Sequence, residues 1–255
     1  YAFSGSGIVN LDIPEGVSYL MQFGIRNCHN LKSINIPSTA VDIDNYFLTN
    51  CENLESIVIA EDNPCYSSGD DANAIFIDDT VFLGCKNTDF SQFEGITIID
   101  SGAFEGSGIE SANIPEGIKE IRNSAFENCK SLENVTFPTT LETFGEYCFE
   151  GCEALKAIVI PESISELPLA SFRDCTSLTS VTLPDSLVSI DDSCFSGNAL
   201  LESIFIPSSV TYIGAFAFAT CSKLTISCEA SEAQPGWDSL WNVSGCPVVW
   251  NATRP

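Results

Sequence analysis

A segment of 23 residues repeats along this chain of 255 residues, and the period restricts the possible folds more than any other feature. A fixed period of about 20–50 residues is typical of repeat proteins, in which each repeat packs against its two neighbours. The first residues of consecutive segments, each 23 positions after the one before, are Cys129, Cys152, Cys175, Asn198 and Cys221, and earlier in the chain Cys28 and Cys51.

Each repeat contains one short strand that ends at a proline. In the segment that starts at Cys152, Leu155, Ile158 and Ile160 precede Pro161, and their alternation predicts a strand with one buried face. Proline has no N–H to donate, so it marks where the strand stops. Such a strand cannot bury its apolar face alone, whereas stacked copies about 4.8 Å apart can. We therefore predict a solenoid of parallel strands around one continuous apolar column.

The repeat is interrupted once, between Ile59 and Gly102. Residues 61–79 are rich in turn formers, which predicts an enlarged repeat or a protruding loop. Calcium binding in this stretch stays open, because it offers hard oxygen ligands without a spaced loop motif. The oxygen-bearing side chains are Glu61, Asp62, Asn63, Asp70 and Asp71.

The repeat also sets the expected domain organisation. We expect a repeat array over residues 1–228, with an irregular insert at about 60–100, and a C-terminal cap over 229–255 that shields the last coil. Within a coil, residues 190–194 place helix-capping side chains ahead of a small residue and Phe195. This order predicts a single helical or 3₁₀ turn on the side opposite the strands.

The charge of the chain argues against two classes of partner. The sequence has 35 Asp and Glu against 10 Lys and Arg, a formal net charge of −25 at pH 7. Such a surface repels nucleic-acid phosphates and anionic lipid headgroups, which bind clustered Lys and Arg. No apolar run approaches the roughly 20 residues of a membrane-spanning helix. We therefore expect no nucleic-acid partner and no membrane insertion.

Six of the twelve cysteines occupy one repeat position, which Asn198 fills without loss of register. We interpret them as a buried ladder of small side chains, because neighbours with parallel Cβ vectors fit disulfide geometry poorly. Evenly spread single thiols cannot bring four ligands around a zinc ion, so we expect no metal site and no cofactor. Two disulfides in irregular segments stay open, between Cys65 and Cys85 and between Cys228 and Cys246.

The sequence offers no convincing catalytic group. His29 is the only histidine and follows Cys28 directly in a variable turn, where a nucleophile and its base would not face each other. Acidic doublets such as Asp78 with Asp79 are typical of solvated turns. We therefore expect no catalytic residue and no enzyme activity.

The consensus Cys-x-x-Leu-x-x-Ile-x-Ile-Pro, which ends in Ala-Phe-x-x-Cys, resembles the BspA-like leucine-rich repeats. It is best seen at 152–175 and 198–221, and the resemblance extends from Phe3 to about Ser227. It implies a β-rich α/β fold, a right-handed leucine-rich-repeat solenoid with a parallel sheet on one side and short helical or 3₁₀ turns and irregular segments on the other. It also implies a secreted or cell-surface protein, typical of gut bacteria, that adheres to host or bacterial macromolecules.

The outward side chains of the strands are the best candidate binding residues. Three apolar members, Val58, Val159 and Phe205, would lie in water without a partner, which is typical of a binding surface; β-propensity alone is the other explanation. We expect a monomer that binds a host or bacterial surface protein or glycan, with a polysaccharide-active enzyme and a structural spacer as alternatives. The predicted row is Asn35, Val58, Asn113, Thr136, Val159, Thr182 and Phe205.

Overall fold

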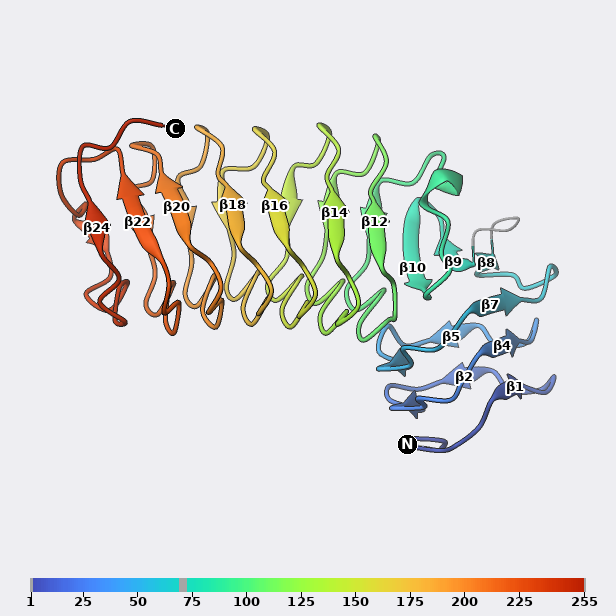
Figure 1. Cartoon of the computed structure of the whole chain (residues 1–255). Coiled ribbons are helices and arrows are strands. Elements are labelled where there is room, and N and C mark those ends of the chain that lie inside the picture. Colours follow the sequence, from blue (N-terminus) through green and yellow to red (C-terminus); the bar gives the residue numbers. More distant parts are fainter. Residues whose placement is uncertain (1, 69–72, 255) are drawn as a thin grey trace.

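The computed structural model describes residues 2–68 and 73–254 and is a solenoid of short strands (Figure 1). Most coils contribute one strand to each of two sides, and strands of successive coils pair in parallel. Among the described residues, none forms a helix with the length and hydropathy that a bilayer-spanning segment needs. The predicted solenoid with parallel sheets is confirmed.

The coils before residue 60 form what we call the N-terminal stack. On the side that carries the predicted strands, the order of the parallel sheet is β1 (Asn10–Asp12), β4 (Ser33–Ile36) and β7 (Ser56–Ile59). On the opposite side, two-residue strands pair as β2 (Tyr19–Leu20) with β5 (Asp42–Ile43) and β3 (Ile25–Arg26) with β6 (Leu48–Thr49).

The coils from residue 98 onward form the C-terminal stack. Its longer strands are β12 (Ser111–Asn113), β14 (Asn134–Thr136), β16 (Ala157–Val159), β18 (Ser180–Thr182), β20 (Ser203–Ile206), β22 (Thr225–Cys228) and β24 (Val248–Val249). On the opposite side lie β11 (Ile98–Ile99), β13 (Glu120–Ile121), β15 (Thr143–Phe144), β17 (Glu166–Leu167), β19 (Ser189–Ile190), β21 (Tyr212–Ile213) and β23 (Gly236–Trp237). We call the outward side of β12 to β24, together with that of β1, β4 and β7, the strand face.

The stretch that interrupts the repeat is a hairpin between the two stacks. Strands β8 (Ser67–Ser68), β9 (Ala74–Ile77) and β10 (Thr80–Gly84) pair in antiparallel fashion, and the 3₁₀ helix η1 (Phe90–Gln92) follows. Both faces of the hairpin are buried: Ile75 and Phe82 join the core of the N-terminal stack, whereas Phe76 and Val81 join that of the C-terminal stack. The expectation of one continuous apolar column is therefore wrong, because the hairpin divides the core in two.

The hairpin also changes the direction of the solenoid. Figure 1 shows β12 to β24 side by side, while β1, β4 and β7 run in a different direction at one end. Strand β9 lies against β7 of the N-terminal stack, and β10 pairs in parallel with β11 on the opposite side of the C-terminal stack. Away from the strand face the stacks touch directly, where the backbone N–H of Asn50 donates to the carbonyl of Glu105 at 3.2 Å. The hairpin thus connects the strand side of one stack to the opposite side of the other, and the solenoid bends there.

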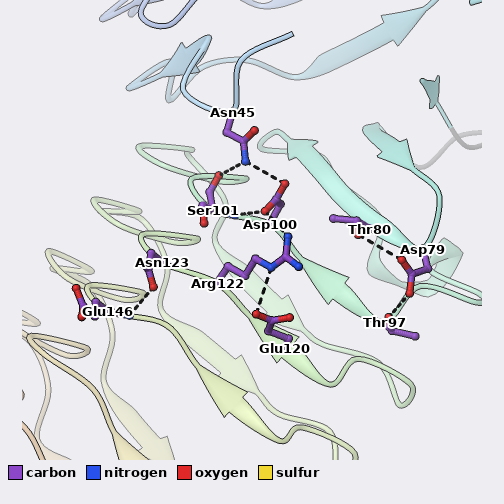
Figure 2. Close-up of polar contacts among 10 residues, drawn as sticks. All are labelled: Asn45, Asp79, Thr80, Thr97, Asp100, Ser101, Glu120, Arg122, Asn123 and Glu146. Carbon is purple, nitrogen blue, oxygen red and sulfur yellow. Dashed lines mark hydrogen bonds and ion pairs between the residues drawn. The ribbon is translucent and has the colours of Figure 1, made fainter. Parts of the chain in front are cut away.

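A polar contact joins the stacks at this bend (Figure 2). The amide Nδ2 of Asn45 donates to Asp100 Oδ2 at 2.9 Å and to the carbonyl of Ser101 at 3.3 Å. The other carboxylate oxygen of Asp100 accepts from Arg122 Nη1 at 2.9 Å, and Arg122 also donates to Glu120. Asp100 therefore links a side chain of the N-terminal stack to an arginine of the C-terminal stack.

A ladder of phenylalanines fills the core of the C-terminal stack. Adjacent rings are stacked within 8° of parallel, with centroids 4.8 to 5.8 Å apart. Trp241 meets the last ring edge-on at 6.2 Å and packs against Trp237, so aromatic side chains from the predicted cap cover the end of the ladder. The ladder consists of Phe104, Phe126, Phe149, Phe172, Phe195 and Phe218.

The expectation of a helical or 3₁₀ turn at 190–194 is wrong. Strand β19 ends at Ile190, and Ser193 has φ 55°, a left-handed conformation that stops helix propagation. The same conformation recurs every 23 residues, and η1 is the only helical segment in the described part of the chain. The equivalent left-handed residues are Ser124, Tyr147, Ala170, Ser193 and Phe216.

Candidate functional site

The structure places the predicted strand-face residues in register across neighbouring coils. Asn35 pairs with Val58, Asn113 with Thr136, and Val159 with Thr182. Polar members bond to one another: Asn35 Nδ2 donates to Asp12 Oδ1 at 2.5 Å and Thr136 Oγ1 to Asn113 Oδ1 at 3.2 Å. Within each stack, identical repeat positions therefore form a row, as their spacing predicted.

The row is divided by the bend. Val58 belongs to the sheet of β1, β4 and β7, and Asn113 to that of β12 and β14, with the hairpin between them. Asn35 and Val58 thus lie on the N-terminal stack, apart from the other candidates. On the C-terminal stack Val159 is 65% exposed between Thr136 and Thr182. This valine is the clearest apolar residue in water on the strand face.

Phe205 is not left in water without a partner. The guanidinium of Arg254 lies over its ring at 5.1 Å from the centroid. Arg254 also donates to the carbonyl of Leu183 at 3.2 Å and forms an ion pair with Asp185. The C-terminal segment therefore crosses the strand face at β18 and β20. The expectation that Phe205 is exposed and unpartnered is wrong, because a cation from a distant part of the sequence covers it.

The repeat cysteines form a buried ladder of hydrogen bonds. The thiol of Cys129 donates to the carbonyl of Phe104 at 3.0 Å, one coil earlier, and the cysteines that follow repeat this contact. Asn198 keeps it, since its Nδ2 donates to the carbonyl of Phe172 at 3.0 Å. Burial raises the pKa of the Cys129 thiol well above its usual range. These thiols are thus structural donors, which confirms the interpretation as a ladder.

All twelve cysteines are free thiols, so neither of the two disulfides left open is present. Cys28 donates to the carbonyl of Phe3 at 3.0 Å, whereas its neighbour His29 pairs with Glu52 at 2.9 Å. In the described part of the chain, no three His, Cys, Asp or Glu side chains gather into a group that could hold a metal ion.

The calcium ligands considered in the insert fall into three groups. Glu61 and Asp62 are exposed on a turn. Asp70 and Asp71 lie outside the described residues. Asn63 has a structural role: its Nδ2 donates to the carbonyl of Ala40 at 2.8 Å, and its Oδ1 accepts from the backbone of Cys65 and Tyr66. Its oxygen is therefore engaged in closing the turn that leads into the hairpin.

A half-buried carboxylate, that of Glu105, lies at the bend. Burial raises the pKa of the Glu105 carboxyl to about 7; nearby Glu127 raises it further, and Arg26 opposes the shift. The adjoining cavity, shared with Cys51 and Cys85, measures about 10 Å³. This space holds at most one water molecule. This cavity is therefore too small to hold a substrate.

This carboxylate predicts a pH dependence of stability. A raised folded-state pKa means that the contribution of Glu105 is fully present below about pH 4.5 and is lost as the pH rises through about 7. We expect Glu105→Gln to raise the free energy of unfolding at pH 8 by about 1–2 kcal/mol, a figure reduced for partial solvent screening. At pH 4 the variant and the parent should agree. Urea unfolding at both values measures the difference.

Glu162→Gln provides the control for this prediction, because Glu162 is exposed on a turn of the C-terminal stack. We expect it to leave the difference between pH 4 and pH 8 unchanged. An equal gain for Glu105→Gln at both pH values would contradict the assignment, since the gain would then not depend on ionisation.

One cavity at the bend was not predicted from the sequence. It measures about 480 Å³, and we call it the crook cavity. Both stacks line it with the turns around their repeat cysteines, which the sequence marked only as variable. The repeat pattern does not predict that these turns lie close together, because their proximity results from the bend. The N-terminal stack contributes Asn27, His29, Asn50 and Glu52.

Comparison with solved structures gives the same fold. A leucine-rich repeat protein from Bacteroides ovatus ATCC 8483 is 26% identical, with a TM-score of 0.67, over 96% of this chain and 64% of that chain. A leucine rich cell surface protein from Faecalibacterium prausnitzii A2-165 is 23% identical, with a TM-score of 0.62, over 97% of this chain and 61% of that chain. This chain thus spans less than two thirds of the length of either protein.

A third structure, a leucine-rich repeat protein from Eubacterium ventriosum ATCC 27560, is 20% identical, with a TM-score of 0.66, over 86% of this chain and 66% of that chain. No curated protein matches the chain. The profile described as the BspA type leucine rich repeat region matches in six copies, over residues 1–72, 75–175 and 145–232. These matches cover most of the sequence, and the chain therefore belongs to the BspA type leucine-rich repeat family.

Proposed function

We propose that the chain is the binding module of a secreted or cell-surface protein, and that the strand face of the C-terminal stack recognises a surface protein of a host or of another bacterium. The name of the Faecalibacterium prausnitzii relative, a cell surface protein, supports the location. The exposure of Val159, at 65%, supports the surface. A binding rather than a catalytic role agrees with the small cavity beside Glu105.

Val159 carries the proposal because of its surroundings. It is an aliphatic side chain between Thr136 and Thr182, whose hydroxyls can donate and accept hydrogen bonds. An apolar centre with a polar rim is the usual composition of a protein interface. The net charge of −25 favours a cationic partner surface and keeps the free module soluble.

Val159→Asp tests this surface. The substitution removes a central apolar contact and places a charge in the interface. We expect it to weaken binding at least about 30-fold, a cost of about 2 kcal/mol or more. The measurement is biolayer interferometry against a panel of purified host matrix proteins and bacterial surface proteins, with wild-type and variant modules. Phe205 is unsuitable for this purpose, because Arg254 covers it.

Val188→Asp is the matched control. Val188 is 43% exposed and lies immediately before β19, away from the strand face. It should bind like the wild type. Equal binding by Val159→Asp would remove the strand face from consideration, and a module that binds no panel member would favour the structural spacer.

A further inference from the structure

The crook cavity lies between the two stacks at the bend, away from the strand face. From the C-terminal stack it is lined by Ser107, Asn128, Lys130 and Ser131, and from the N-terminal stack by turns that include Asn27 and Asn50. Its volume of about 480 Å³ falls within the range of about 300–1,000 Å³ that is usual for small-molecule sites. Eight of the nine lining residues have polar or charged side chains, and no Phe, Tyr or Trp side chain contributes to the lining.

An unpartnered hydroxyl marks the wall of this cavity. Ser107 occupies the repeat position of the cysteine ladder and is 7% exposed, yet its Oγ has no hydrogen-bond partner. In later coils the cysteine thiol at this position donates to the carbonyl of the phenylalanine one coil earlier. The antiparallel hairpin precedes Ser107 in place of a regular coil, and Ser107 does not make this contact. A buried hydroxyl without a partner costs about 1–3 kcal/mol. Its Oγ is shielded from solvent, so a ligand recovers this cost only when the side chain turns toward the cavity.

The amides of the crook are a second, independent observation. Each coil needs a left-handed residue just before the cysteine position, and glycine satisfies this need at Gly151 and Gly197. Asparagine takes the position at the crook, in Asn27, Asn50 and Asn128, with φ between 54° and 58°. The backbone conformation therefore does not by itself require an amide. Asparagine thus occupies this position in three of the four turns that line the cavity, and Gly106 occupies it in the fourth.

The charges at the cavity are paired. His29 Nδ1 lies 2.9 Å from Glu52, and Lys130 Nζ lies 2.7 Å from Glu153. These carboxylates would repel an anionic ligand, and the positive charges paired with them would repel a cationic one. The remaining groups are amides and hydroxyls, each of which can both donate and accept. Among the described residues, the side chains of Asn27, Asn50, Ser107 and Ser131 make no hydrogen bond.

We propose that the crook cavity binds a neutral saccharide unit of a glycan. Adjacent sugar hydroxyls donate and accept in the same way as amides and serine hydroxyls, so both partners are satisfied without a net charge. The site is separate from the strand face and does not depend on the function proposed for it. In the absence of an aromatic platform, affinity rests on hydrogen bonds, and we expect a Kd of about 1 mM or weaker for a trisaccharide.

The test begins with a printed array of neutral, sialylated and sulfated oligosaccharides. Binding is expected to neutral members, and NMR titration with maltotriose, cellotriose, chitotriose and mannotriose then measures affinity. A glycoprotein carrying the preferred glycan, before and after enzymatic deglycosylation, distinguishes a protein-linked source from a free one. Failure of every neutral oligosaccharide and glycoprotein to bind overturns the proposal.

Two tryptophan variants test the position of the site: one blocks the cavity, and the other leaves it open. Ser131→Trp fills the mouth and is expected to weaken saccharide binding at least about 10-fold. Ser177→Trp is its matched control, since Ser177 occupies the same repeat position two coils away and does not line the cavity. It should bind like the wild type. Equal affinity of the two variants contradicts the proposed site.

Two further variants separate binding from structure. Asn50→Gly keeps a residue suited to the left-handed backbone but removes the amide, and it is expected to weaken binding about 3–10-fold. Ser107→Ala removes the unpartnered hydroxyl, so stability should stay equal or rise while affinity falls by a similar factor. Unchanged affinity in both variants would show that these groups are structural. Val159→Asp should leave saccharide binding intact, which keeps this test independent of the strand face.

Discussion

Replacement of Phe149 by alanine is expected to lower the free energy of unfolding by about 3–5 kcal/mol. Its ring is fully buried and stacks on Phe126 at 5.1 Å and on Phe172 at 5.5 Å. It also meets Phe137 and Phe144 edge-on. Removal of the ring leaves a cavity at two coil interfaces at once, and in a repeat array these interfaces supply much of the stability. Urea unfolding followed by circular dichroism measures the loss.

Phe3→Ala is the matched control for this prediction. Phe3 begins a unit of the same sequence pattern as Phe104, and thus holds the same repeat position, but it is 43% exposed at the N-terminal end of the stack. Its loss should cost about 1 kcal/mol, because less apolar area leaves contact with the protein. Equal losses for Phe3 and Phe149 would show that the ladder adds little beyond ordinary burial.

Much of the fold could be predicted because the period determines which residues touch. Thr136 lies 23 positions after Asn113, and the two pair in neighbouring strands. The same step places Phe126 and Phe149 in one stack, and it brings the Cys129 thiol close to a carbonyl one coil earlier. In a solenoid, residues one repeat apart in the sequence lie in contact on adjacent coils. The repeat pattern is therefore sufficient to predict the strand register and these contacts.

The hairpin and the covering of Phe205 lay outside that rule. Ile75 and Phe76 point to different cores, and a strand buried on both faces lacks the alternation of polar and apolar residues that reveals orientation. Arg254 meets Asp185 across 69 positions, three repeat lengths, whereas the repeat predicts contacts between adjacent coils only. The crook cavity depends on the bend, so its lining could not be assembled from the sequence either.

Replacement of Gly108 by alanine is expected to destabilise the bend by about 2–3 kcal/mol. A Cβ at this position would lie 1.9 Å from the carbonyl oxygen of Glu52, and backbone cannot move aside as a flexible side chain can. Gly106 is as crowded, with Asn50 as its neighbour. The shorter unit with its two glycines therefore permits the close contact of the stacks. Thermal unfolding measures the cost, and small-angle X-ray scattering measures any opening of the bend.

Gly7→Ala tests whether this cost comes from the contact or from the motif. Gly7 holds the same place in the other short unit, but its nearest neighbour to an added Cβ is Asn30 Nδ2 at 3.8 Å. Alanine there should stabilise by about 0.4–1 kcal/mol, because it restricts the unfolded chain. Opposite signs for the two substitutions would assign the cost at Gly108 to the packing of one stack on the other. A similar destabilisation at both positions would instead show that the motif needs glycine for its own conformation, and the bend would then need another explanation.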